Sequence, residues 1–155
     1  MKPHDLIKSA KVLLKAEKGK PSQVNLRRSI STAYYAMFHC LARQSADLLV
    51  GVGASGKSKP AWRQVYRALE HKAASNACKD NIINKFPDSI TDFANLFIAM
   101  QEKRHSADYD PFVSFTRSEV IQDIATIELA ISNFEKESTK DRRAFCAFIL
   151  FKKRA

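Results

Sequence analysis

One uninterrupted segment, residues 25–44 (NLRRSISTAYYAMFHCLARQ), constrains the fold of this chain more than any other. It has no Gly or Pro and is rich in Ala, Leu, Met and Arg, which favour helices. Its apolar residues recur at spacings of three and four, as on a helix with one buried face. This stripe consists of Leu26, Ile30, Ala33, Met37 and Leu41. We expect the chain to be organised around a long helix here.

A second face of the same helix carries polar side chains. Arg28, Tyr35 and His39 follow at spacings of seven and four, so they lie along one side of a helix with 3.6 residues per turn. Tyr34 and Phe38 lie between the two faces and widen the apolar stripe. A basic, an aromatic and a titratable side chain are therefore expected in one row.

The remaining apolar periodicity predicts further helices and no strand. Amphipathic patterns cover approximately residues 4–18, 62–78, 88–104 and 116–134, and the long helix is expected to extend over 22–48 with Ser22 as its N-cap. The predicted fold is all-α: an antiparallel up-and-down bundle of four long helices and a shorter fifth, over residues 1–137.

Residues 138–155 form a separate extension. Phe145 to Phe151 is an apolar run with basic residues on both sides. It is too short to cross a bilayer, which needs about 20 apolar residues. A docked final helix, a dimer contact and an interfacial anchor are the alternatives, and the first two are favoured.

The charge of the chain indicates an anionic partner. It has 26 Lys and Arg against 16 Asp and Glu, a formal net charge of +10 over 155 residues. Such an excess indicates nucleic acid, nucleotide or an acidic protein as the partner. The alternative interpretation is a basic protein that binds anions only nonspecifically. Cys40, Cys78 and Cys146 lack metal-site spacing and are expected to be reduced thiols. We expect a cytoplasmic protein with no signal peptide, membrane span, metal or cofactor.

A glycine-rich loop, residues 51–58 (GVGASGKS), matches the formal phosphate-loop pattern. That motif binds phosphate when a strand precedes it and a helix begins at its Lys-Ser. Here a helix precedes the loop and Pro60 follows it, so a flexible basic loop is the preferred interpretation.

A second polar segment, residues 103–111 (KRHSADYDP), ends the fourth predicted helix. Arg104 offers a planar fork to phosphate, His105 can exchange protons near neutral pH, and Asp108 or Tyr109 can position either one. The alternative is a polar helix C-terminus followed by a turn.

These two polar segments together resemble the HEPN superfamily of small helical bundles. The resemblance is carried by residues 26–29 (LRRS) leading into 33–39 (AYYAMFH), and by Arg104 followed by 107–110 (ADYD). It covers roughly residues 5–135. More narrowly, the sequence resembles the branch of uncharacterised bacterial and archaeal HEPN proteins with the AYYAxFH and RxxADYD motifs.

The resemblance implies a bundle that often dimerises and works near RNA or nucleotides. The implied settings are toxin–antitoxin systems, phage defence and partnership with a nucleotidyltransferase. Active HEPN members are metal-independent ribonucleases in which four to six residues separate an arginine from a histidine. Counting from Arg104, this chain has Tyr109, Asp110 and Pro111 at those positions.

Two hypotheses follow. In the first, the protein is a metal-independent endoribonuclease. Arg28 and Arg104 hold the phosphate, and His39 or His105 transfers protons. Asp108 orients Arg104 or a histidine, Tyr35 or Tyr109 stacks on a base, and Arg27 also contacts the ligand. In the second, the same residues bind RNA or nucleotide, or dock a nucleotidyltransferase or antitoxin, without catalysis. The departure from the arginine–histidine spacing favours the second.

Overall fold

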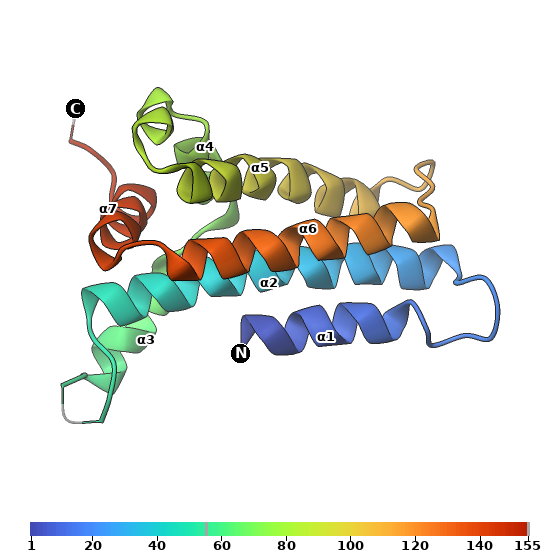
Figure 1. The fold of residues 1–155 in the computed structure, drawn as a ribbon, viewed down its shortest axis with the longest axis horizontal. Coiled ribbons are helices and arrows are strands. Elements are labelled where there is room, and N and C mark those ends of the chain that lie inside the picture. The colour runs from blue at the N-terminus through green and yellow to red at the C-terminus, as the bar shows by residue number, and fades with distance from the viewer. Residues whose placement is uncertain (55, 155) are drawn as a thin grey trace.

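The computed structural model describes residues 1–54 and 56–154 and confirms the all-α class, since no strand occurs within those residues. Figure 1 shows long helices lying side by side, with shorter ones at one end. The elements are α1 (Pro3–Leu13), α2 (Gln23–Leu49), α3 (Lys59–Ala68), α4 (His71–Cys78), the 3-10 helix η1 (Asn81–Lys85), α5 (Asp88–Tyr109), α6 (Arg117–Lys136) and α7 (Thr139–Leu150).

The long helix α2 is the centre of the molecule. It contacts α1, α3, α5, α6 and α7, and Figure 1 shows it extending along the whole bundle. All five residues of the predicted stripe, from Leu26 to Leu41, are buried. Ser22 is its N-cap, and the Ser22 hydroxyl accepts a hydrogen bond from the Asn25 amide at 3.2 Å.

The helices α5 and α6 complete the core against α2. Their predicted apolar stripes are buried throughout: Ile90, Phe93, Ala94, Phe97 and Met100 on α5, and Val120, Ile124, Ile127, Ile131 and Phe134 on α6. Stacked Phe93 and Phe134 rings, 4.7 Å apart, join the two helices. The buried faces predicted from periodicity are therefore the packed ones.

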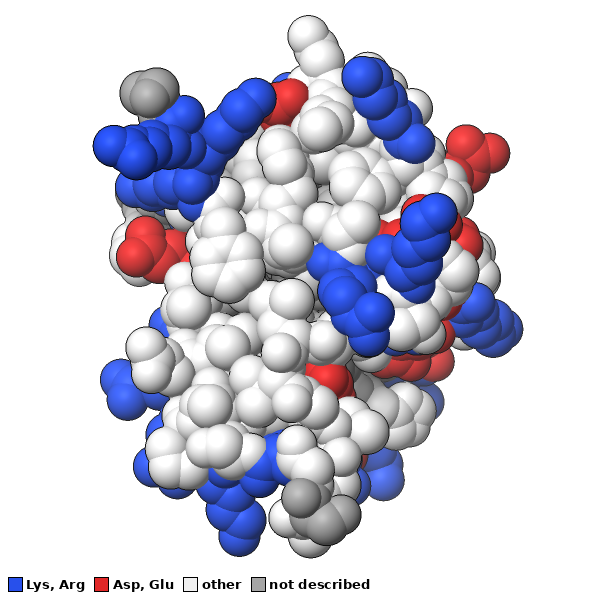
Figure 2. All heavy atoms as spheres, turned by 90° about the vertical axis from the view of Figure 1, so that its left-hand side faces the viewer, with Lys and Arg blue, Asp and Glu red and all other residues white. Residues whose placement is uncertain are grey.

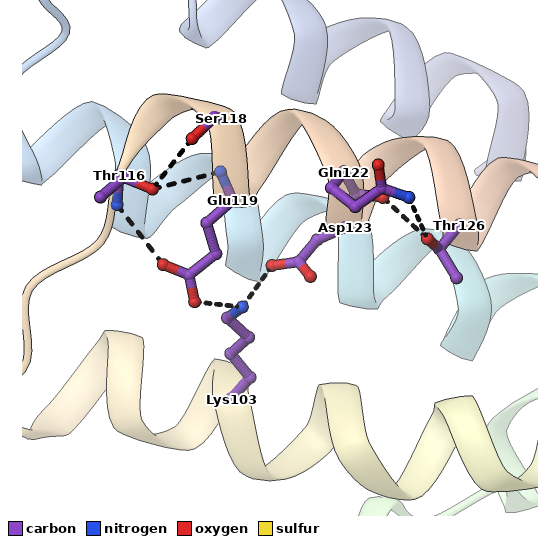
Figure 3. A network of polar contacts seen from close by, with 7 residues as sticks. All are labelled: Lys103, Thr116, Ser118, Glu119, Gln122, Asp123 and Thr126. Atoms are coloured by element: carbon purple, nitrogen blue, oxygen red, sulfur yellow. Dashed lines mark hydrogen bonds and ion pairs between the residues drawn. The ribbon is translucent and has the colours of Figure 1, made fainter.

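A polar contact also ties α5 to α6. Lys103 Nζ lies 2.7 Å from Glu119 Oε1 and 2.6 Å from Asp123 Oδ2, as Figure 3 shows. Glu119 belongs at the same time to the capping box of Thr116, which begins α6. Lys103 thus joins the C-terminal half of α5 to two successive turns of α6.

The third predicted helix differs from expectation, because it is divided. The chain is extended at Leu69 (φ −68°, ψ 125°) and Glu70 (φ −116°, ψ 137°), so α3 ends at Ala68 and α4 begins at His71. Leu69 is buried at this break. The break lets the chain turn while an apolar side chain stays in the core.

The fourth predicted helix is longer than expected. The sequence predicts an end near Arg104 and a turn from His105, but α5 continues to Tyr109. It stops at Asp110, which is extended (φ −95°, ψ 109°), as the residue before a proline prefers. Arg104 and Asp108 consequently lie one helical turn apart on the same side of α5.

The C-terminal extension contains the helix α7, which packs on α2 and α4. Phe145, Cys146 and Ile149 are buried in the common core, whereas Phe151 beyond the helix is 63% exposed. Arg142 donates to the Gln44 side chain on α2 at 2.6 Å. Among the described residues, no helix is both long and apolar enough to cross a membrane.

Candidate functional site

The candidate site centres on Arg104, which lies where α5 crosses the aromatic part of α2. Its guanidinium carbon is 5.2 Å from the ring centre of Tyr34 and 5.8 Å from that of Tyr35. Only 11% of the Arg104 side chain is exposed. The two rings hold a largely enclosed cation by cation–π contacts.

The charge of Arg104 is only loosely paired. Its nearest carboxylate is Asp108, with 3.4 Å between Nη1 and Oδ2, and its Nε is buried without a hydrogen-bond partner among the described residues. Asp108 Oδ2 also lies 3.4 Å from the Ser31 hydroxyl on α2. These long contacts leave hydrogen-bonding capacity on the guanidinium, which a stronger acceptor such as phosphate could use.

Sequence reasoning missed His71, the first residue of α4. Its Nδ1 is 2.7 Å from the Tyr34 hydroxyl, and its ring stacks on Phe38 at 3.9 Å. It also meets the edge of Tyr35 at 5.7 Å. Arg104 and His71 therefore share Tyr34 and Tyr35 as neighbours. No local pattern marked this histidine, because its partners lie on a different helix.

The titration of these groups follows from burial. Burial lowers the pKa of His71 below its ordinary 6.5, and the nearby Arg104 and His39 charges lower it further. Burial raises the pKa of Tyr34 well above 10, more than Arg104 can oppose. Tyr34 stays protonated and can donate to Nδ1, which leaves the proton of a neutral His71 on Nε2.

The predicted site residue His39 lies one step further along α2. Its Nδ1 is 2.5 Å from the hydroxyl of Tyr66 on α3, and its ring is 6.2 Å from Tyr35. Burial lowers the pKa of His39, and the N-terminal charge contributes in the same direction. A continuous row of rings thus joins His71, Tyr35, His39 and Tyr66.

The predicted contact residues Arg27 and Arg28 have different environments. Arg27 donates to three main-chain carbonyls at and after the C-terminal end of α5, those of Ala107 (3.0 Å), Asp110 (2.7 Å) and Val113. It thereby fixes the loop that follows the site. Arg28 is exposed, and it precedes Ser31 by three residues, so it lies on the same side of α2 as the contact with Asp108.

The other predicted residues, His105 and Tyr109, lie on the outer surface of α5. Their rings are 5.0 Å apart, His105 is exposed and Tyr109 is 68% exposed. The next aromatic residue, Phe112, is 94% exposed. The structure brings Arg104, Asp108, Tyr35 and His71 together, and leaves this aromatic pair beside them at the surface.

The glycine-rich loop 51–58 connects two helices, α2 and α3. Ser55 lies outside the described residues. Gly51 (φ 127°) and Gly53 (φ 87°) adopt backbone angles that favour glycine. Lys57 Nζ lies over the Trp62 ring, 4.7 Å from its centre. Among the described residues, no group of three or more His, Cys, Asp and Glu side chains could hold a metal ion.

The arrangement can bind an anion and exchange a proton next to it. Arg104 supplies a fixed positive charge in a poorly hydrated place, where its attraction for phosphate is stronger than in water. His71 and His39 supply neutral imidazoles on the aromatic row.

Comparisons with protein-family models, with curated proteins and with solved structures found no match for this chain.

Proposed function

We propose that this chain is a HEPN-type protein directed at RNA or nucleotides, of the toxin–antitoxin or phage-defence kind, and that Arg104 binds a phosphate group of the ligand. The observation that carries the proposal is the state of Arg104. Its side chain is 11% exposed, rests on two tyrosine rings, and has an unpartnered Nε among the described residues. A nearly enclosed arginine whose contact with its carboxylate neighbour Asp108 is long, at 3.4 Å, is suited to an anion that arrives from outside.

The surroundings support a phosphate on a nucleotide rather than a small isolated anion. Arg28 is exposed on the same side of α2, and Tyr109 presents an exposed ring near Asp108. A phosphodiester chain needs several cations in a row, and its bases stack on aromatic rings. The net charge of +10 adds a long-range attraction for such a polyanion.

A metal-independent endoribonuclease is a second candidate, and the position of His71 favours it. In this reaction a neutral His71 or His39 takes the proton of the ribose 2′-hydroxyl, and the 2′-oxygen forms a bond to phosphorus. The bond from phosphorus to the 5′-oxygen breaks, the histidine that took the proton gives it to that oxygen, and a cyclic phosphate remains. Arg104 would stabilise the charge on the phosphoryl oxygens.

The partner and location belong to the same proposal. An antitoxin, a nucleotidyltransferase or a second copy of the chain would cover the exposed Tyr109 and Phe112, the latter 94% exposed. The three cysteines are free and buried, as in proteins of a reducing cytoplasm.

The test is incubation of the purified protein with total RNA and short labelled oligoribonucleotides in EDTA. Wild type is compared with Arg104→Ala, His71→Ala and His39→Ala, and with Arg117→Ala, an exposed arginine on α6, as the control. Circular dichroism melting of every variant separates loss of fold from loss of function.

The outcomes distinguish the candidates. Cleavage that is lost in Arg104→Ala and His71→Ala, but kept in Arg117→Ala, supports the ribonuclease. Binding without cleavage, weakened only by Arg104→Ala, supports the binding module. Binding that is equal in Arg104→Ala and wild type, both folded, would refute the phosphate site.

A further inference from the structure

The helix α3 differs from every other helix in its lack of buried residues. None of the residues Lys59–Ala68 is buried, and the helix carries basic but no acidic side chains. Lys59, Arg63 and Arg67 follow at spacings of four, so they form one row on its surface. All three are exposed, and none makes an ion pair with a described residue. Like charges one turn apart repel, so the row does not help the helix to fold.

Another side of α3 is fixed to α2 by polar aromatic contacts. Trp62 Nε1 donates to Asp47 Oδ1 at 2.8 Å, and the Tyr66 hydroxyl lies 2.5 Å from His39 Nδ1. The Trp62 and Tyr66 rings stack at 5.1 Å. The aromatic residues therefore face inward, which turns the basic row toward solvent.

The outer surface of α3 is shallowly hollowed and surrounded by positive charge. A hollow of about 550 Å³ is lined by Pro60, Arg63, Gln64, Arg67 and Ala68. Between residues 57 and 72 the sequence has five Lys and Arg and one Glu. Figure 2, which views the end of the molecule where α3 lies, shows Lys and Arg side chains projecting at the lower edge with few acidic ones between them.

We infer that the outer face of α3 follows the phosphate backbone of a single-stranded RNA whose scissile or bound phosphate is at Arg104. The inference rests on the proposed function and names its substrate class. Residues four apart on a helix are separated by about 6 Å along its axis, so the row can meet successive phosphates of an extended strand.

The path from α3 to Arg104 is continuous. The Tyr66 ring lies 5.8 Å from His39, His39 lies 6.2 Å from Tyr35, and Tyr35 lies 5.8 Å from the Arg104 guanidinium carbon. Unpaired bases stack on such rings, whereas bases in a duplex are already stacked on each other. A single strand therefore fits this row of rings better than a duplex does.

A membrane surface is the other polyanion that a basic helix can bind, and the structure favours RNA over it. Interfacial helices insert an apolar face between lipids. In α3 the apolar side, with Trp62 and Tyr66, is occupied by contacts to α2. The helix α3 therefore has no free apolar face that could insert between lipids.

The experiment measures binding of an unstructured oligoribonucleotide of about 12 nucleotides and of a dinucleotide, each over a range of salt concentration. Arg63→Ala/Arg67→Ala is compared with wild type. Lys8→Ala/Lys15→Ala, with Lys8 on α1 and Lys15 just after it, removes the same charge elsewhere and is the matched control. Arg104→Ala reports on the proposed function separately.

We expect Arg63→Ala/Arg67→Ala to bind the oligomer several-fold more weakly. The slope of log K against log salt should become shallower by about 1.4, which corresponds to two lost phosphate contacts on a single strand. The dinucleotide should bind as it does to wild type, because it reaches only the Arg104 end. The control pair should leave both ligands unaffected.

Other outcomes overturn the inference in distinguishable ways. An unchanged slope in Arg63→Ala/Arg67→Ala, with binding still lost in Arg104→Ala, refutes the role of α3 and leaves the proposed function intact. Equal affinity of wild type for a duplex of the same length refutes the single-strand assignment. Binding to anionic vesicles that needs Arg63 and Arg67, without an effect on RNA, assigns α3 to a membrane surface. Absence of any RNA binding by wild type refutes both proposals.

Discussion

The hydroxyl of Tyr34 and Nδ1 of His71 lie 2.7 Å apart, although 37 residues separate them in the chain. Tyr34 is fully buried, and its hydrogen bond joins α2 to the first residue of α4. This one contact orders the histidine that shares Tyr34 and Tyr35 with Arg104. It also explains how α4 is oriented immediately after the break in the chain.

Tyr34→Phe should lower the free energy of unfolding by about 1–2 kcal/mol, because a partly buried polar group of His71 loses its partner. Denaturant unfolding followed by circular dichroism measures the change. Tyr35→Phe is the control and should change stability by less than about 0.5 kcal/mol, since its hydroxyl makes no hydrogen bond to a described residue. Equal losses in the two variants would contradict the assigned contact.

Arg27 and Arg28 are adjacent in sequence and should respond oppositely to truncation. Arg27→Ala removes three hydrogen bonds to the carbonyls of Ala107, Asp110 and Val113. We expect a loss of about 2–3 kcal/mol in unfolding free energy, since each bond comes from a charged donor. Arg28→Ala, at an exposed position, should stay within about 0.5 kcal/mol of wild type but weaken RNA binding. A stability loss of the same size in both would show that the loop is held in another way.

Stability should decrease when the pH is lowered below the ordinary histidine pKa of 6.5. The pKa values of folded His39 and His71 are lowered, chiefly by burial. Between those lowered values and 6.5 the unfolded chain binds more protons, so the free energy of unfolding rises with pH in that window. The contribution is complete above 6.5 and is lost as the pH falls toward the folded values.

Urea unfolding at several values between about pH 8 and about pH 5 measures this dependence. His39→Gln/His71→Gln should flatten the curve in that range, whereas replacing the exposed His105 by Gln should leave its slope unchanged. A curve of the double variant that is as steep as wild type would assign the pH dependence to other groups.

Lys103→Met should destabilise the contact of α5 with α6 by about 1–3 kcal/mol. The Lys103 and Asp123 side chains are only 22% and 19% exposed, so removal of the cation leaves a poorly hydrated carboxylate. Burial already raises the pKa of Asp123, and Lys103 opposes that rise. Addition of Asp123→Asn should therefore recover part of the loss.

A double-mutant cycle on Lys103 and Asp123 should give a coupling free energy above about 0.5 kcal/mol. The matched control is Lys11→Met, whose pair with Glu128 is more exposed, at 51% and 42% of the side chains. That variant should lose less than about 1 kcal/mol. A coupling near zero would mean that Asp123 is neutralised by other means.

The parts of the fold that were predictable are those with a long, regular apolar stripe. The stripes of α2, α5 and α6 are buried as expected, because period 3.6 reports directly which side of a helix faces the core. The same reasoning predicted the helical segment 62–78 but not the break that divides it into α3 and α4. Trp62 and Tyr66 follow helical spacing, but they make polar contacts with α2 and are only partly buried.

The candidate site was less predictable than the fold. Arg104 and Asp108 stand in one motif, and their spacing of four places them together on a helix. His71 reaches the site because the helix is interrupted at Leu69 and Glu70, and no periodic pattern predicts that interruption. The partners of Arg27 are main-chain carbonyls, which are the same for every residue type, so the sequence does not identify them.

The absence of buried residues in α3 has a dynamic consequence. A segment with no fully buried residue can detach while the rest of the molecule stays folded, so its free energy of opening should be far below that of global unfolding. Amide hydrogens of α3 should then exchange with solvent before those of α2. Each such opening would separate the Tyr66 hydroxyl from His39, so fluctuation of one short helix would set how often that imidazole is free to act.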